Sequence, residues 1–184
     1  MEQEKDIFIV RLRQQNRTAC QQLLNDYGPT VFQLVRRIVG CQEDAEEVYQ
    51  DVFLKALQAI DRYDHRATLL GWLRRIAYHE ALNFIRRRRP AIVYMDDQDP
   101  ALNNMDDTSE EDIHDTETVQ ALERALTLLP AYERTIITMF YYDDMSLADI
   151  AYVTSSNPST IGSQLSRIRK KLYRIIKTEK HERK

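Results

Sequence analysis

The stretch from Ser156 to Lys171, SNPSTIGSQLSRIRKK, decides how the last third of this 184-residue chain is interpreted. Asn157 and Pro158 form a typical helix start, because asparagine caps a helix N-terminus and proline is tolerated at the first helical position. Apolar residues then recur at steps of four and three. These residues are Ile161, Leu165, Ile168, Leu172 and Ile175. The stretch therefore predicts an amphipathic helix rather than a loop with a basic tail.

A shorter helix is expected just before this one, over residues 146–153, where Ser146 and Asp149 have the spacing of a capping box. Two short helices joined by a tight polar turn are typical of a helix-turn-helix, whose second helix enters the major groove of DNA. The side chains expected to face base edges are Ser159, Thr160, Ser163, Gln164 and Arg167. Those suited to phosphate contact are Arg169, Lys170 and Lys171. A solvated amphipathic helix is the alternative interpretation.

Helical periodicity also runs through the rest of the chain, which has only 4 Gly and 5 Pro and shows no strand-like alternation. Before residue 91 the expected helices are one over about 5–13, a short one that breaks at Gly28-Pro29, and one that ends at Gly40. Another carries the apolar stripe from Ala45 to Ile60, and the last runs from Leu69 to Arg89, where Pro90 stops it. Two more are expected over 117–128 and 131–142. We therefore expect an all-α fold made of two small helical domains.

Charge divides the chain into three blocks. Residues 91–117 carry 10 acidic side chains and no Lys or Arg, whereas the flanking blocks, 1–90 and 118–184, carry net charges of +3 and +4. An acidic segment of low hydrophobicity is expected to be an extended linker. The sequence thus predicts domains over 1–90 and 118–184 joined by a linker over 91–117. Charge asymmetry of this kind often accompanies nucleic-acid binding.

Several classes of protein are disfavoured. The sequence has no Gly-rich phosphate loop, nucleophile elbow or HExxH motif, so we expect a protein that is not an enzyme and needs no cofactor. Two cysteines and four scattered histidines predict neither a disulfide framework nor a metal site. No apolar run reaches the length of a membrane span and the N-terminus lacks the layout of a signal peptide. A cytoplasmic protein without membrane insertion is expected.

Two surfaces of the N-terminal half stay open to more than one interpretation. An acidic face is expected on the helix that follows Gly40, consisting of Asp44, Glu46, Glu47, Gln50 and Asp51. It is either solvated or docks a basic partner protein. The run Arg86–Arg89 lies near several aromatic residues. It is either a helix C-terminus with favourable cations or a patch that follows a nucleic-acid backbone.

Two long segments resemble a known family. YGPTVFQLVRRIVGCQEDAEEVYQDVFLKALQAIDRYD, followed by LLGWLRRIAYHEALNFIRRRRP, resembles region two of bacterial RNA polymerase sigma factors of the extracytoplasmic-function (ECF) group. LPAYERTIITMFYYDDMSLADIAYVTSSNPSTIGSQLSRIRKKL resembles region four of the same group. The resemblance spans about residues 18–90 and 120–176. It implies a promoter-specificity subunit that recruits core RNA polymerase, and a stand-alone helix-turn-helix regulator is the alternative.

The resemblance also implies roles for particular residues. It implies that the acidic face docks on the clamp helices of the largest polymerase subunit and that the helix from Pro158 reads the duplex −35 element. A specificity loop would hold a flipped base of the melted −10 element. The −10 residues implied by the resemblance are Arg62, Tyr63, Asp64, His65, Arg66 and Thr68 in the loop, and Trp72, Arg75, His79 and Asn83 on the following helix. It further implies an anti-sigma partner and no small-molecule substrate.

The chain departs from the family pattern in and after its helix-turn-helix. Thr154, Ser155 and Ser156 replace a turn commonly written Leu-Gly-Ile, which predicts weaker packing between the last two helices. Gly162 stands where the family often has lysine. It should cost the helix up to about 1 kcal/mol relative to alanine and removes one phosphate contact. The sequence therefore predicts a modest affinity for the −35 element.

Overall fold

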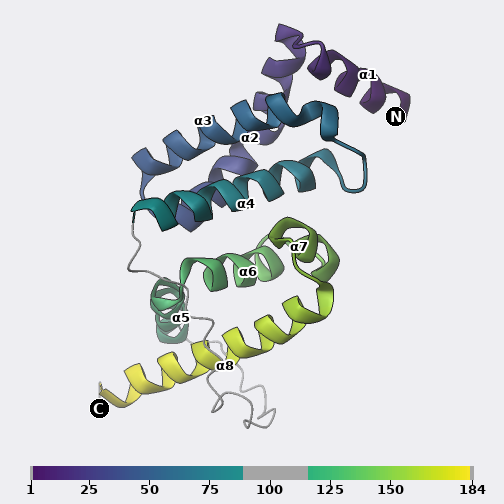
Figure 1. Ribbon diagram of the computed structural model, residues 1–184. Coiled ribbons are helices and arrows are strands. Elements are labelled where there is room, and N and C mark those ends of the chain that lie inside the picture. The colour runs from purple at the N-terminus through teal and green to yellow at the C-terminus, as the bar shows by residue number, and fades with distance from the viewer. Residues whose placement is uncertain (1, 89–115, 183–184) are drawn as a thin grey trace. The chain divides into compact units, whose positions relative to one another are not determined.

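The computed structural model describes residues 2–88 and 116–182, and within these ranges the chain is helical and contains no β-strand (Figure 1). The expected all-α fold is confirmed. Most of the predicted acidic linker lies outside the described residues. The chain divides into two compact units, one built on α1 to α4 and the other on α5 to α8, except that Ala151–Ser156 is grouped with the first.

The first unit is a helical bundle. Its elements are α1 (Glu2–Arg13), α2 (Arg17–Val39), α3 (Gln42–Ala59), the 3₁₀ turn η1 (Ile60–Arg62) and α4 (Leu69–Arg88). Helices α2, α3 and α4 pack against one another in all three pairings, and α1 contacts α2 and η1. The largest fully buried side chains are aliphatic: Leu12, Leu23, Val31, Val35, Ile38, Val48, Val52 and Leu73. This core buries the apolar stripes that the sequence predicts.

The predicted break at Gly28-Pro29 is wrong, because α2 runs through both residues as one helix. A proline inside a helix normally clashes with the residue before it, through that residue's Cβ and N–H. Here the preceding residue is glycine, which has no Cβ, so part of this clash is absent. Packing also favours continuity, since Gly28 is buried and a Cβ there would lie only 2.6 Å from the hydroxyl oxygen of Tyr49 on α3. Tertiary contact therefore overrides the local breaking signal.

The second unit contains α5 (Thr116–Leu128), α6 (Ala131–Tyr141), α7 (Leu147–Thr154) and α8 (Pro158–Glu182). Helix α8 packs against α5 and α6. Its apolar stripe is the one that the sequence predicts, with Ile161, Leu165, Ile168 and Leu172 all buried. The bounds of α5, α6 and α7 agree with the predicted helices to within one residue, and α8 begins at Pro158 as predicted. The stretch from Ser156 to Lys171 is therefore helical from Pro158 onward.

Side-chain caps define both helices of the helix-turn-helix. The Asp149 amide donates to Ser146 Oγ at 3.1 Å, and the Ser146 hydroxyl donates to Asp149 Oδ2 at 2.6 Å. At the start of α8, the Thr160 amide donates to Asn157 Oδ1 at 2.8 Å. Both predicted caps are confirmed. The turn between them includes Ser155, whose φ of 58° lies in the left-handed region that favours glycine.

We expect Gly28→Ala to lower the free energy of unfolding by about 1–2 kcal/mol. The new methyl group would overpack against Tyr49, and this cost exceeds the gain of about 1 kcal/mol in helix propensity. Tyr49→Phe removes the hydroxyl, and the next nearest ring atom, Cζ, lies 3.6 Å from the added Cβ, at ordinary contact distance. In the Tyr49→Phe background the Gly28→Ala substitution should therefore cost clearly less than it does in the unsubstituted chain.

The measurement is urea denaturation followed by the fluorescence of Trp72, the one tryptophan of the chain, which lies on α4 of the first unit. An equal loss from Gly28→Ala in the presence and in the absence of the Tyr49→Phe substitution would show that the hydroxyl contact is not the constraint.

Ser155→Gly should raise the free energy of unfolding by about 0.5–1 kcal/mol. Relief of the left-handed strain outweighs the larger conformational entropy that glycine gives the unfolded chain. Urea denaturation followed by circular dichroism measures the change. The matched control is Ser156→Gly, because Ser156 does not have a positive φ and should gain nothing. Equal effects at the two positions would contradict the strain argument.

Candidate functional site

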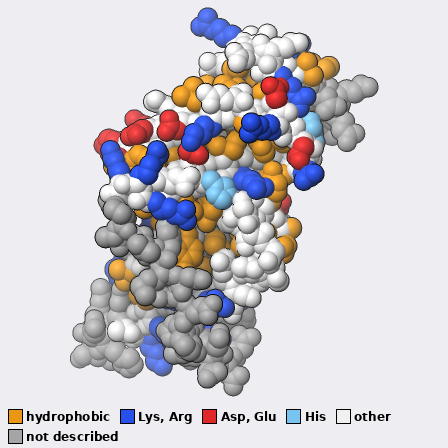
Figure 2. Space-filling view, viewed as in Figure 1, with side chains coloured by type: hydrophobic (Ala, Val, Ile, Leu, Met, Phe, Trp, Pro, Cys, Tyr) orange, Lys and Arg blue, Asp and Glu red, His pale blue; other side chains and the backbone are white. Residues whose placement is uncertain are grey.

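The acidic face predicted on α3 is present as a surface of mixed exposure. Glu46, Glu47 and Gln50 are exposed, whereas Asp44 and Asp51 are half-buried. Figure 2 shows Asp and Glu side chains gathered beside Lys and Arg on this part of the molecule. The exposed part of the face is therefore narrower than the sequence indicates, and Glu46, Glu47 and Gln50 are its most accessible members.

Asp44 is held by the C-terminal end of α4. Its Oδ1 accepts an ion-pair hydrogen bond from Arg88 Nη1, and 21% of the Asp44 side chain is exposed. The Arg88 guanidinium also lies over the ring of Phe84, 4.9 Å from its centroid. Arg88 thus ties α4 to α3, which favours a structural role for this member of the arginine run. Arg86 and Arg87 are exposed.

A shallow groove borders the acidic face, between α2 and α3. It has a volume of about 700 Å³ and is lined by Leu24, Asn25, Gly28, Pro29, Phe32, Glu46, Tyr49 and Gln50. Tyr49 forms its aromatic wall, with its ring 5.7 Å from Phe32 and 4.9 Å from Phe53 between centroids. Burial raises the pKa of Tyr49, so the phenol stays neutral at physiological pH. Sequence reasoning missed this groove, because it predicted a break in α2 at Gly28-Pro29.

The predicted specificity loop is folded around the side chain of Tyr63. Its ring is buried, with centroids 5.4 Å from Trp72 and 4.6 Å from His65, and its hydroxyl donates to the Ala67 carbonyl at 2.9 Å. His65 has a φ of 61°, a left-handed conformation that costs energy for a residue other than glycine. The loop is therefore held in a defined and locally strained shape.

Two further contacts fix the loop after Tyr63. The Arg66 amide donates to Asp64 Oδ1 at 3.2 Å, and Arg66 Nε lies 3.0 Å from Asp64 Oδ2. Thr68 Oγ1 accepts from the Gly71 amide at 3.1 Å and so caps the start of α4. The exposed loop side chains are Arg62, Asp64, His65, Arg66 and Thr68. The buried Tyr63 ring contacts one of them, His65, and so supports the loop from within.

The four predicted −10 residues beyond the loop share one face of α4. Trp72, Arg75, His79 and Asn83 are spaced by three, four and four residues, which places them in a row along the helix. The first three are half-buried and Asn83 is exposed. The loop and this row are continuous at Trp72, because its ring contacts Tyr63. The structure thus brings the predicted −10 residues together on one element and the loop before it.

The predicted −35 residues lie along α8 but differ in exposure. Ser159, Ser163, Arg167 and Arg169 are exposed, whereas Thr160, Gln164, Lys170 and Lys171 are half-buried. The Gln164 side-chain oxygen is itself buried and has no hydrogen-bond partner among the described residues. Lys171 Nζ lies 3.0 and 3.3 Å from the two carboxylate oxygens of Glu133 on α6. Lys171 therefore links α8 to α6, and only 34% of its side chain is exposed.

Neither a metal centre nor a disulfide is found in the described ranges. No group of three or more His, Cys, Asp or Glu side chains within residues 2–88 and 116–182 is placed to hold a metal ion. Cys20 and Cys41 are both free and half-buried. Among the helices of these same ranges, none is both long and apolar enough to cross a bilayer.

Comparisons with known proteins identify both units. A family model for sigma-70 region 2 matches residues 23–91, and a model for sigma-70 region 4 matches residues 119–172. RNA polymerase sigma factor SigV of Bacillus subtilis is 29% identical over 156 residues, covering 85% of this chain and 89% of the relative. ECF RNA polymerase sigma factor SigW of the same organism is 24% identical over 178 residues, covering 92% and 95%.

Solved structures show the same fold. CnrH, solved with the cytosolic domain of CnrY, gives a TM-score of 0.65 at 23% identity and covers 94% of this chain and 96% of that one. The sigma factor RpoE of Bartonella quintana, solved with the anti-sigma factor NepR, gives 0.61 at 22% identity, covering 85% and 96%.

A stand-alone helix-turn-helix regulator would account for the second unit alone, whereas the matches cover region two and region four in order. Region two carries the acidic face and the predicted −10 residues, and region four carries the helix-turn-helix. The chain therefore belongs to the ECF sigma factors, the promoter-specificity subunits that bind core RNA polymerase and promoter DNA and are not themselves enzymes.

Proposed function

We propose that core RNA polymerase docks on the acidic face of α3 together with the adjoining groove. The observation that supports this most directly is the position of Glu46 and Gln50, which belong to the acidic face and also line the groove. A partner helix with basic side chains could pair with the carboxylates while an apolar side chain enters beside Tyr49 and Phe32. Asp44 contributes mainly through Arg88, because that pair fixes the start of α3 against α4.

The loop from Arg62 to Thr68 and the row of Trp72, Arg75, His79 and Asn83 on α4 bind the melted −10 strand in this proposal. Extrusion of a base costs a few kcal/mol of stacking, so a preformed pocket that captures it stabilises the open duplex. The contacts of Tyr63 keep the loop preformed, and the strained His65 fits the usual association of backbone strain with binding loops. Trp72 and Arg75 supply an aromatic ring and a cation, the side-chain types that stack on bases and hold phosphates.

The N-terminal half of α8 reads the duplex −35 element in the same proposal. Ser159 and Ser163 are small and exposed, and Arg167 follows one turn later with a side chain that can pair with guanine. The Ser159 hydroxyl donates to Asn157 Oδ1, and the Ser163 hydroxyl donates to the Ser159 carbonyl. The lone pairs of both hydroxyl oxygens can therefore still accept a hydrogen bond from a base. Arg169 and Lys170 hold phosphates, whereas Lys171 is engaged by Glu133.

The remaining assignments are also proposals. The division into domains over 1–90 and 118–184 with an acidic linker over 91–117 fits the two family matches, which end and begin near these boundaries. We place the protein in the cytoplasm, where core polymerase is found. The relative RpoE was solved with the anti-sigma factor NepR, and we propose that an anti-sigma factor also controls this chain.

Transcription with purified core polymerase tests the proposed function. Start sites of transcripts induced by overexpression supply the promoter, because their upstream sequences align on both elements. The reconstituted holoenzyme should initiate at these sites. Binding of the purified chain to duplex DNA without any specific initiation from these promoters would contradict the proposal.

Glu47→Lys should weaken the binding of core polymerase by about fivefold or more at low salt, because it replaces an attractive charge on the docking face with a repulsive one. Titration of a fluorescently labelled chain with core polymerase measures the affinity. The matched control is Asp26→Lys, an equal charge reversal at an exposed position of α2 outside the groove lining. Similar losses from the two reversals would indicate a general charge effect rather than docking at α3.

Arg169→Ala should weaken binding to every −35 variant to the same extent and reduce the slope of log K against log salt by about one, as expected for one lost phosphate contact. Binding is measured on duplex −35 DNA across a salt series. Lys177→Ala is the control, because Lys177 lies two turns further along α8, 6.0 Å from the centroid of Tyr173. A slope that changes for Lys177→Ala but not for Arg169→Ala would reverse the assignment.

A further inference from the structure

The last residue of α1 reaches the loop proposed to bind the −10 element. Arg13 Nη2 donates to the Tyr63 carbonyl oxygen at 3.2 Å, and Arg13 Nε lies 3.8 Å from Asp61 Oδ1. Arg13 and Tyr63 are 50 positions apart in the sequence. Helix α1 also packs directly against η1, the turn that leads into the loop. The contact therefore joins an N-terminal helix to the entry of the loop.

Tyr63 makes most of the contacts that hold the loop, so a shift of its backbone would move the loop as a whole. It ends η1, where its amide donates to the Ile60 carbonyl at 3.1 Å. Its ring contacts Trp72 and His65, and its hydroxyl reaches Ala67. Arg13 holds the carbonyl of this same residue, so its guanidinium fixes the peptide that connects η1 to the strained segment at His65.

Helix α1 is itself firmly seated, which makes it able to act as a support. Ile9 and Leu12 are 4% and 0% exposed, so the apolar side of α1 is buried just before Arg13. The Arg13 side chain is 38% exposed and thus partly shielded from water. Helix α1 also precedes the residues matched by the region 2 family model, which begin at residue 23. The support for the loop therefore comes from a helix that lies outside the residues matched to sigma-70 region 2.

We propose that Arg13 is a positioning residue for recognition of the −10 element. It acts through the Tyr63 carbonyl to keep the loop from Arg62 to Thr68 in the shape that accepts an extruded base. The proposal rests on the proposed function of that loop. Arg13 itself touches no nucleotide. Its loss leaves the loop attached through Tyr63 but free to shift, so the loop adopts its binding shape less often.

The test uses the holoenzyme and a single-stranded oligonucleotide that carries the −10 element, taken from the aligned start sites, with 2-aminopurine at the base expected to flip. Arg13→Ala should weaken binding about five- to tenfold, the effect of losing a partly exposed hydrogen bond from a charged donor, and should reduce the change in 2-aminopurine fluorescence. Arg13→Lys should restore part of the affinity, because its ammonium can donate to the same carbonyl but lacks the fork of a guanidinium.

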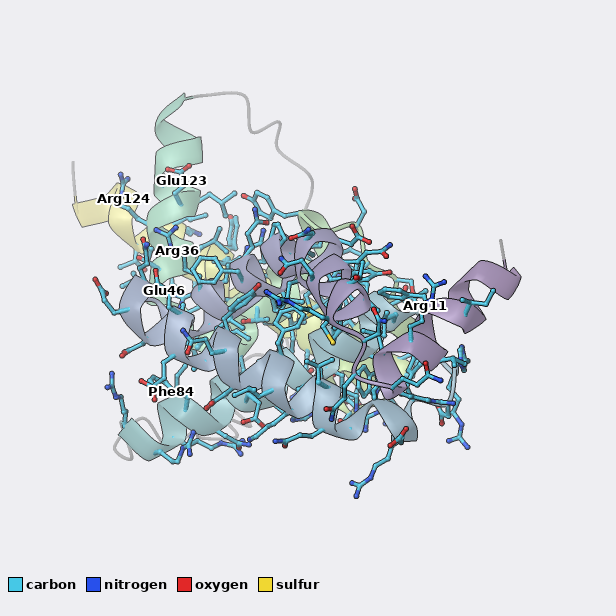
Figure 3. The ribbon with its side chains drawn as sticks, turned by 90° about the horizontal axis from the view of Figure 1, so that it is seen from above. Arg11, Arg36, Glu46, Phe84, Glu123 and Arg124 are labelled. Atoms are coloured by element: carbon cyan, nitrogen blue, oxygen red, sulfur yellow. The ribbon has the colours of Figure 1, made fainter. Side chains whose placement is uncertain are left out.

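Three controls separate positioning from other effects. Arg11→Ala removes an equal charge from an exposed position of the same helix and should behave as the unsubstituted chain (Figure 3). Core polymerase affinity and binding of duplex −35 DNA should be unchanged in Arg13→Ala. His65→Ala alters the loop directly and reports whether the loop binds the strand at all.

The outcomes are distinguishable. If His65→Ala weakens −10 binding and Arg13→Ala does not, the positioning role is overturned while the proposed function of the loop stands. If neither variant changes −10 binding or the fluorescence, both the proposed function of the loop and the role of Arg13 fail. Equal losses of core binding and −10 binding in Arg13→Ala would overturn positioning in favour of general destabilisation.

Discussion

The close approach of Tyr49 to Gly28 is the contact on which the first unit depends. It lets α3 lie directly on α2 at the one place where α2 contains Gly28 and Pro29, and the helix runs through both. Because α2 packs on both α3 and α4, a break there would displace the faces that these two helices present. The acidic face and the predicted −10 residues of α4 therefore have their positions set by a glycine that belongs to neither group.

Local signals in the sequence account for most of the fold. The period of apolar residues and the caps at Ser146 and Asn157 predict the helices of the second unit closely, because a cap is a contact within four residues. The continuity of α2 could not be predicted in this way. It depends on Tyr49, which approaches Gly28 from a different helix. The helix-breaking signal of Gly28-Pro29 was overridden by a contact between residues that are distant in the sequence.

The charges of the candidate site could likewise be predicted only in part from the sequence. Sequence patterning identifies which faces are acidic or basic, but it does not reveal which charged side chains are already paired. Lys171 resembles its basic neighbours in sequence, yet Glu133, 38 residues away, holds it within the second unit. Asp44 belongs to the acidic pattern and is engaged by Arg88. Such pairs lower the number of charges offered to DNA or polymerase below the number counted along the chain.

Two turns at proposed DNA-binding elements place a residue other than glycine in the left-handed region, His65 in the loop before α4 and Ser155 between α7 and α8. Each costs of order 1–2 kcal/mol, so neighbouring contacts must hold the turn in place. Around His65 these are the Tyr63 and Thr68 bonds, and after Ser155 it is the Asn157 cap. Each turn thus keeps its shape through specific contacts of its neighbours, and at Ser155 these include backbone hydrogen bonds from the Ser155 and Ser156 amides to the Tyr152 and Ala151 carbonyls. Loss of a single supporting bond should therefore change the geometry of either DNA-binding element more than it changes the stability of the chain.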